Sequence, residues 1–141
     1  MKTLSLDNKK TKWKMSCKSN NNKSLLHKNA LCLIKNIFST FIILEEVEIQ
    51  IKKNKKLYID IFIPLLKIAI EVQGKQHFNF TKFFNNSNFD FIRQKINDRL
   101  KQEWAERNNI TLIRLNYNET PSEWRSKLIN VRGDSKIERI S

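Results

Sequence analysis

Asp60, Glu71 and Gln73 are the side chains in this chain whose types and spacing could do chemistry together. Each acid has apolar residues on both sides, Ile59 and Ile61 around Asp60 and Ile70 and Val72 around Glu71. Carboxylate and amide oxygens are ligands that suit Mg²⁺ or Mn²⁺ and not zinc. The alternative is that both acids are ordinary residues on a solvated sheet face.

The geometry of two adjacent strands decides whether these acids meet. A hairpin centred between Leu65 and Leu66 places Asp60 directly opposite Glu71, with their Cβ atoms about 4.5–5.5 Å apart. Two bare carboxylates at that separation repel each other unless a cation or a shared proton lies between them. Side chains alternate along a strand, so Gln73 shares the face of Glu71. We therefore expect two carboxylates and an amide to converge at one strand end.

The apolar periodicity predicts the elements that hold these residues. Helices are expected over 25–38, 91–108 and 121–129, and strands over 41–51, 57–63, 67–73 and 110–117. Ser24 is expected to cap the first helix, and Thr120 with Glu123 to form a capping box for the last. The order α-β-β-β-α-β-α predicts an α/β (α+β) fold, with a mixed four-stranded sheet flanked by helices.

The length of 141 residues predicts one folded domain, over 24–130, between a flexible basic arm at 1–23 and a loose tail at 131–141. Cys17 and Cys32 lack the spacing of a zinc site or a disulfide framework, which favours the cytoplasm or another reducing compartment. No apolar run reaches ~18 residues, so no membrane-spanning helix is expected. The first residues contain no apolar core of a secretory signal, so secretion is not expected.

The charge balance points to a polyanionic partner. The chain has 27 Lys and Arg against 14 Asp and Glu, a formal net charge of +13. Neutralising phosphates releases condensed counterions, so nucleic acid is the first candidate. An anionic membrane is the second, but no long amphipathic basic helix is evident to bind one. A compositional bias towards Lys and Asn explains their abundance, but it leaves the shortage of acids unexplained.

The long central helix carries two stripes. Apolar residues at four-residue spacing are expected to be buried; they are Ile92, Ile96, Leu100 and Trp104. Gln94, Asp98 and Lys101 share a polar stripe. This stripe either faces the site, where Asp98 would help His77 or hold a second metal and Lys101 would hold phosphate, or it lies in solvent. In solvent, an Asp98–Lys101 or Asp98–Gln102 pair is expected.

Basic and aromatic residues surround the predicted mouth of the site. Lys75, Lys82, Arg93 and Lys95 could steer DNA, although each could equally be a solvated surface residue. Six phenylalanines between Phe78 and Phe91 provide either base-stacking surfaces or core packing.

An Asp strand followed by a strand ending in Glu-x-Gln resembles the PD-(D/E)xK nuclease superfamily, whose members have the restriction-endonuclease-like fold. The longer pattern is similar to the very-short-patch-repair-like branch, including homing endonucleases with an EDxHD motif. The residues that carry the resemblance are Asp60, Glu71-Val72-Gln73-Gly74, Gln76-His77, Gln94, Asp98 and the strand at 110–115. The chain departs from the family at Gln73, where a lysine is usual. The first helix also lacks an acid, so that ligand is missing or comes from Glu46 or Glu48.

The resemblance implies a divalent-metal-dependent DNA endonuclease of the homing, repair or restriction type, from a phage or mobile element. Mg²⁺ or Mn²⁺ would be held by Asp60, Glu71 and the backbone carbonyl of Val72, and would polarise a phosphoryl oxygen and activate water. Gln73 would orient water, because an amide is no base at neutral pH. The proton would pass to bulk water through the metal's hydration shell or to His77, with help from Asp98. The alternative for His77 is an ordinary surface histidine.

Two other functions fit the same sequence. One is a non-catalytic basic module that binds nucleic acid and retains the nuclease fold, which the changes at Gln73 and in the first helix favour. The other is an RNA- or ribosome-associated structural protein, supported by charge alone. A homodimer would let a domain of this size cut both strands, although no stretch of the sequence identifies an interface.

Overall fold

The computed structural model describes residues 2–6, 10–12, 24–74 and 88–140, with the backbone alone at residues 2, 10–12, 88 and 133–140. Its centre is a four-stranded sheet, in the order β3 (Leu44–Lys52), β4 (Lys55–Ile63), β5 (Ile68–Gln73) and β6 (Thr111–Asn116). The first three strands are antiparallel and β6 runs parallel to β5. This is the mixed four-stranded sheet that the sequence predicts.

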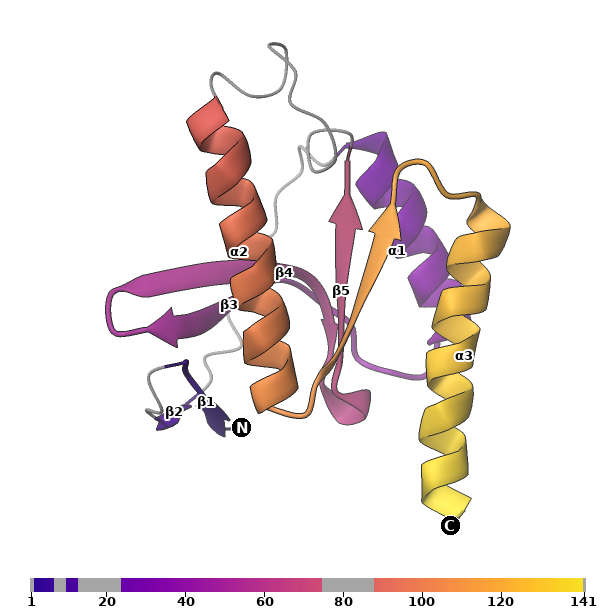
Figure 1. Ribbon diagram of the computed structural model, residues 1–141. Coiled ribbons are helices and arrows are strands. Elements are labelled where there is room, and N and C mark those ends of the chain that lie inside the picture. Colours follow the sequence, from indigo (N-terminus) through magenta and orange to yellow (C-terminus); the bar gives the residue numbers. More distant parts are fainter. Residues whose placement is uncertain (1, 7–9, 13–23, 75–87, 141) are drawn as a thin grey trace.

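Three helices accompany this sheet. They are α1 (Leu25–Ile37), α2 (Asn88–Arg107) and α3 (Pro121–Ile140). Figure 1 shows α2 on one side of β5 and β6, with α1 and α3 on the other side. The observed order α1-β3-β4-β5-α2-β6-α3 confirms the predicted one. Within the described ranges, no helix is both long enough and apolar enough to cross a membrane.

The predicted caps fix where two of these helices begin. The Ser24 hydroxyl accepts the His27 backbone N–H at 3.2 Å, at the start of α1. At α3, the Glu123 N–H donates to the Thr120 hydroxyl and the Thr120 N–H donates back to the Glu123 carboxylate, each at 3.2 Å. This reciprocal pair satisfies two amides that the helix itself leaves unpaired.

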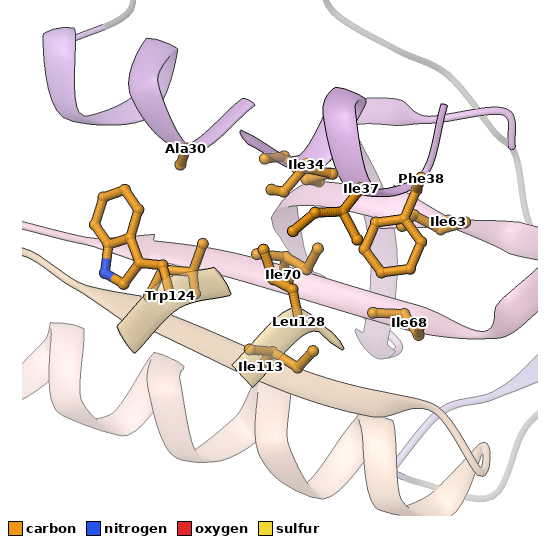
Figure 2. Close-up of a cluster of buried hydrophobic side chains, with 12 residues drawn as sticks. Ala30, Ile34, Ile37, Phe38, Ile63, Ile68, Ile70, Ile113, Trp124 and Leu128 are labelled. Carbon is orange, nitrogen blue, oxygen red and sulfur yellow. The ribbon is translucent and has the colours of Figure 1, made fainter. Parts of the chain in front are cut away.

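The side of the sheet that faces α1 and α3 is an apolar core. Its buried residues include Ile34 from α1, Ile70 from β5 and Leu128 from α3, all fully buried. Figure 2 shows these side chains converging on the sheet from both helices. Burying a side chain of this kind stabilises the fold by about 1.5–3 kcal/mol. Val72 lies at the margin of this cluster, as its alternation with Ile70 requires.

The side that faces α2 is apolar along only part of its length. A second cluster joins the β3–β4 hairpin to the carboxyl-terminal half of α2, with Ile49, Phe62 and Trp104 all buried. Opposite the middle of α2, the sheet presents Glu71 and Gln73 instead. The candidate site therefore lies where the apolar cluster under α2 ends.

The predicted buried stripe of α2 is wrong in its first half. Ile92 is 55% exposed and Ile96 is 45% exposed, whereas Trp104 is fully buried. The helix is rotated so that Asp98 and Lys101 turn towards the sheet. This orientation lets Lys101 reach Glu71.

The prediction that residues 1–23 form a flexible arm is wrong for the described part of that segment. β1 (Lys2–Leu4) pairs with β2 (Lys10–Lys12) as an antiparallel hairpin. The Leu6 N–H donates to the Ile51 carbonyl at 2.7 Å, and Asn108 exchanges two hydrogen bonds with Leu4. These backbone contacts attach the segment to β3 and to the end of α2.

The prediction of a loose tail from residue 131 is also wrong. α3 continues to Ile140, well beyond the predicted end at residue 129. Val131 packs against the apolar core, and the Arg132 guanidinium donates to the Ile37 carbonyl at the end of α1. These tertiary contacts extend a helix that its local sequence ends only weakly at Gly133.

Candidate active site

Asp60 and Glu71 meet where β4 and β5 separate. Ile61 is paired with Ile70 in the antiparallel register that the sequence predicts. At the next pair of residues, Asp60 and Glu71, side-chain hydrogen bonds take the place of backbone-to-backbone ones. The Val72 N–H donates to Asp60 Oδ2 at 2.9 Å, and the Asp60 N–H points at Glu71 Oε2 at 3.4 Å. The two acids therefore bridge the strands at the point where backbone pairing ends.

Glu71 is an acid held in a largely desolvated place. Its residue is 6% exposed. Burial raises the pKa of the Glu71 carboxyl well above its usual value, and the neighbouring Asp60 carboxylate raises it further. The Lys101 ammonium opposes this shift. Asp60 and Glu71 can therefore both be ionised only if a positive charge lies beside them; otherwise the two carboxyl groups share a proton.

Lys101 supplies that positive charge from α2. Its ammonium donates to Glu71 Oε1, and the Lys101 side chain is 16% exposed. The sequence predicts a phosphate ligand at this position, and the structure pairs Lys101 with the carboxylate. The Gln102 side chain donates to Glu106 Oε1 and accepts from the Arg114 guanidinium, each at 3.0 Å. The cation that contacts Glu71 therefore comes from helix α2 and not from a neighbouring position of β5.

Gln73 and Asp98 lie on a pocket of about 340 Å³ beside the acid pair. Gln73 is buried to 7% exposure, on the same face of β5 as Glu71. The residues that line the pocket are Gln73, Lys95, Asp98, Arg99, Gln102 and Arg114. The polar stripe of α2 thus faces the site.

Arg114 is a residue of this pocket that the sequence analysis did not single out. Its guanidinium donates to Gln102 Oε1 at 3.0 Å and to the Asp98 backbone carbonyl at 2.7 Å. It therefore ties β6 to α2 across the pocket. The signal that could have found it is a cation on an inward face of a strand, in register with Glu71 on β5.

The structure describes only some of the residues that were predicted to surround the site. Arg93 is exposed, and its guanidinium lies 4.7 Å from the centre of the Phe89 ring. The Lys95 ammonium lies 5.6 Å from the centre of the Phe91 ring. Gln94 is half-buried on α2. Their roles in DNA binding stay predictions. Lys75, Gln76, His77 and Lys82 lie outside the described residues, as do the phenylalanines from 78 to 84.

The two candidates for the missing first acid have different surroundings. Glu48 accepts the Tyr58 hydroxyl at 3.3 Å and lies 3.8 Å from the Lys56 ammonium, so it belongs to the surface of the hairpin. Glu46 stands beside Asp60 on the neighbouring strand, because the residues flanking it pair with Ile61 and Ile59. Its φ of 47° is unusual for a residue within a strand. Of the two, Glu46 is the nearer to the acid pair.

The donor atoms around the acid pair are of the chemical type that a small hard cation prefers. Asp60, Glu71 and the Val72 carbonyl provide oxygen alone, and each carboxylate oxygen retains a second lone pair beyond the hydrogen bonds described. Burial and, after it, the neighbouring Asp60 carboxylate raise the pKa of Glu71, so a cation bound beside it would favour its ionised form. Within the described chain, no cluster of three or more His, Cys, Asp and Glu side chains is arranged to hold a metal.

Comparison with known proteins adds two viral relatives. The chain is 38% identical over 64 residues to uncharacterized protein 307L of Invertebrate iridescent virus 6, which covers 45% of this chain and 32% of that protein. It is 34% identical over 64 residues to uncharacterized protein 033L of Invertebrate iridescent virus 3, which covers 45% of this chain and 33% of that protein. The chain thus matches about a third of the length of these curated relatives. No protein-family model matches it, and neither does any solved structure.

Proposed function

We propose that the protein is a divalent-metal-dependent DNA endonuclease of the PD-(D/E)xK type. The observation that carries the proposal is the meeting of Asp60 with a buried Glu71 at the end of β5. A net charge of +13 on a chain of 141 residues supports a polyanionic substrate.

Each residue of the site would have a separate role in phosphodiester hydrolysis. Asp60, Glu71 and the Val72 carbonyl would hold Mg²⁺ or Mn²⁺, which supplies Lewis-acid polarisation of a phosphoryl oxygen and acidifies water. Lys101 would leave Glu71 for the phosphate as the cation takes over charge compensation, so that positive charge stays at the site throughout. Gln73 would orient a water through its amide, since it cannot take a proton at neutral pH.

The test is plasmid cleavage in Mg²⁺, in Mn²⁺ and in EDTA. Asp60→Asn and Glu71→Gln each remove a charge with little change in size, and we expect each to abolish metal-dependent nicking. Glu103→Gln is the matched control, because Glu103 is an exposed acid of α2. Cleavage by Asp60→Asn at the wild-type rate would overturn the proposal.

A non-catalytic nucleic-acid-binding module is the second candidate, and one observation favours it. Lys101 already compensates the charge of Glu71, so the acid pair can be stable without a metal. This function predicts DNA binding with no cutting in any metal, and equal or tighter binding by Asp60→Asn.

A further inference from the structure

The tip of the β3–β4 hairpin carries a dense group of positive charges far from the acid pair. Within five consecutive residues it has four lysines: Lys52, Lys53, Lys55 and Lys56. Lys52 and Lys53 are exposed, and Asn54 between the strands is exposed as well. Together with Asn54, the first three of these lysines line a pocket of about 300 Å³. We call residues 52–56 the lysine tip.

The pairing at the lysine tip works against the hairpin itself. Lys52 is the cross-strand partner of Lys55, and like charges in directly opposite positions destabilise a strand pair. The Lys56 ammonium lies 3.8 Å from Glu48 across exposed surface, where ion pairs contribute little. A polyanion bound at the tip would relieve this repulsion.

The tip is held on a firm base. Val47, Ile49 and Ile59 from the two strands are buried against Trp104 of α2. Figure 1 shows the hairpin extending away from β5 and β6, with its turn at the outer end. The lysines are thus presented on a supported arm.

We propose that the lysine tip binds the phosphate backbone of duplex DNA at a distance from the scissile bond. This inference rests on the proposed function for its second contact point, Asp60. Lys55 and Asp60 lie on the same strand, and five residues of β strand span about 17 Å. DNA rises about 3.4 Å per base pair, so with the reach of a lysine side chain the contacted phosphates lie about five to seven base pairs from the cut.

Nucleic acid fits the tip better than an anionic bilayer does. Membrane-bound hairpins need apolar side chains to enter the lipid, and the lysine tip has none. Tyr58 is the one large apolar side chain of the described hairpin strands that is exposed, at 39%, and it is hydrogen-bonded to Glu48.

The test compares two triple variants that lose the same charge. The first is Lys52→Gln, Lys53→Gln and Lys55→Gln, and the control is Lys28→Gln, Lys35→Gln and Arg125→Gln at exposed sites of α1 and α3. Binding to a labelled duplex of about 25 base pairs is measured by fluorescence anisotropy in EDTA over a series of salt concentrations. Thermal unfolding followed by circular dichroism checks that both variants fold.

We expect the tip variant to raise Kd about tenfold or more and to lower the salt slope by about two to three, since each lost phosphate contact removes about 0.9. The control should change Kd by less than about threefold. Equal weakening of both variants would overturn the inference, because net charge alone would then explain binding. Loss of binding to phosphatidylserine vesicles with unchanged DNA binding would overturn it in favour of a membrane.

The design separates this inference from the proposed function. If the wild type binds DNA through the tip but never cuts, the tip inference stands and the endonuclease fails. If the wild type cuts and the tip variant binds as the wild type does, the endonuclease stands and the tip inference fails.

Discussion

The two faces of β5 both carry buried side chains, but the chemistry of those side chains differs. Ile68 and Ile70 point towards α1 and α3 and are fully buried among other apolar side chains. Glu71 and Gln73 point towards α2 and are nearly as buried, at 6% and 7% exposure. Burial on the first face is stabilising in itself, whereas burial on the second raises the pKa of an acid and requires a lysine from α2. One face of β5 therefore stabilises the fold, and the other carries a buried acid that needs a cation from α2.

The largest loss of stability is expected when an acid is placed on the apolar face of β5. We expect Ile70→Glu to cost on the order of 5 kcal/mol or more, because the new carboxylate would be buried among apolar side chains. Such a loss can unfold a domain whose whole stability is about 5–15 kcal/mol. Ile92→Glu is the control, since Ile92 is 55% exposed, and it should unfold like the wild type in urea. A folded Ile70→Glu protein would contradict the contrast between the faces.

Removing the lysine on the polar face should have a smaller effect that depends on pH. Lys101→Met leaves an ionised Glu71 buried without its cation, which we expect to cost about 3 kcal/mol near pH 8. At a pH below the raised pKa of Glu71 the carboxyl is neutral in the folded protein, so the cost should shrink. Urea unfolding at several pH values measures this.

Lys35→Met is the control for that experiment, because Lys35 is exposed on α1. A loss of stability in Lys101→Met that is the same at all pH values would mean that Lys101 contributes packing and not charge.

The smallest expected effect is a gain in stability. The folded pKa of Glu71 is raised above its unfolded value, so the stability that this group contributes is fully present at acidic pH and is lost as the pH rises through the folded pKa. Glu71→Gln removes that loss, and we expect Tm to rise by roughly 2–4 °C at pH 8. Near pH 4 the two proteins should melt together. A lower Tm for Glu71→Gln at pH 8 would show that the ionised pair stabilises the fold.

Divalent cations offer a further measurement on the same residues. If Asp60 and Glu71 hold Mg²⁺ or Mn²⁺ in the folded protein, a cation concentration 100 times its Kd should stabilise it by about 2.7 kcal/mol. Asp60→Asn should abolish this gain, and Glu103→Gln should keep it. An equal gain in all three proteins would place cation binding elsewhere.

Most of the fold could be predicted because its signals are local. Ser24, Thr120 and Glu123 cap the helices as expected, since a cap depends on residues within one turn. The register of Asp60 against Glu71 was also predictable, because the connection between β4 and β5 is short and leaves the strands little freedom. Positions that depend on distant segments were not predictable in this way, as the docking of Leu6 on Ile51 illustrates.

The sequence by itself determined the strands of the central sheet, the starts of α1 and α3 and the pairing of the two acids. Hydrophobic period, caps and a short hairpin connection each act over a few residues, so these features could be predicted. Only the tertiary structure decided the rotation of α2, which exposes Ile92 and brings Lys101 to Glu71 from 30 residues away. A helix with a weak apolar face can present several sides to a sheet, and the buried charge of Glu71 selects the one with a matching cation. Which residues surround the acid pair is therefore decided by how α2 packs on the sheet.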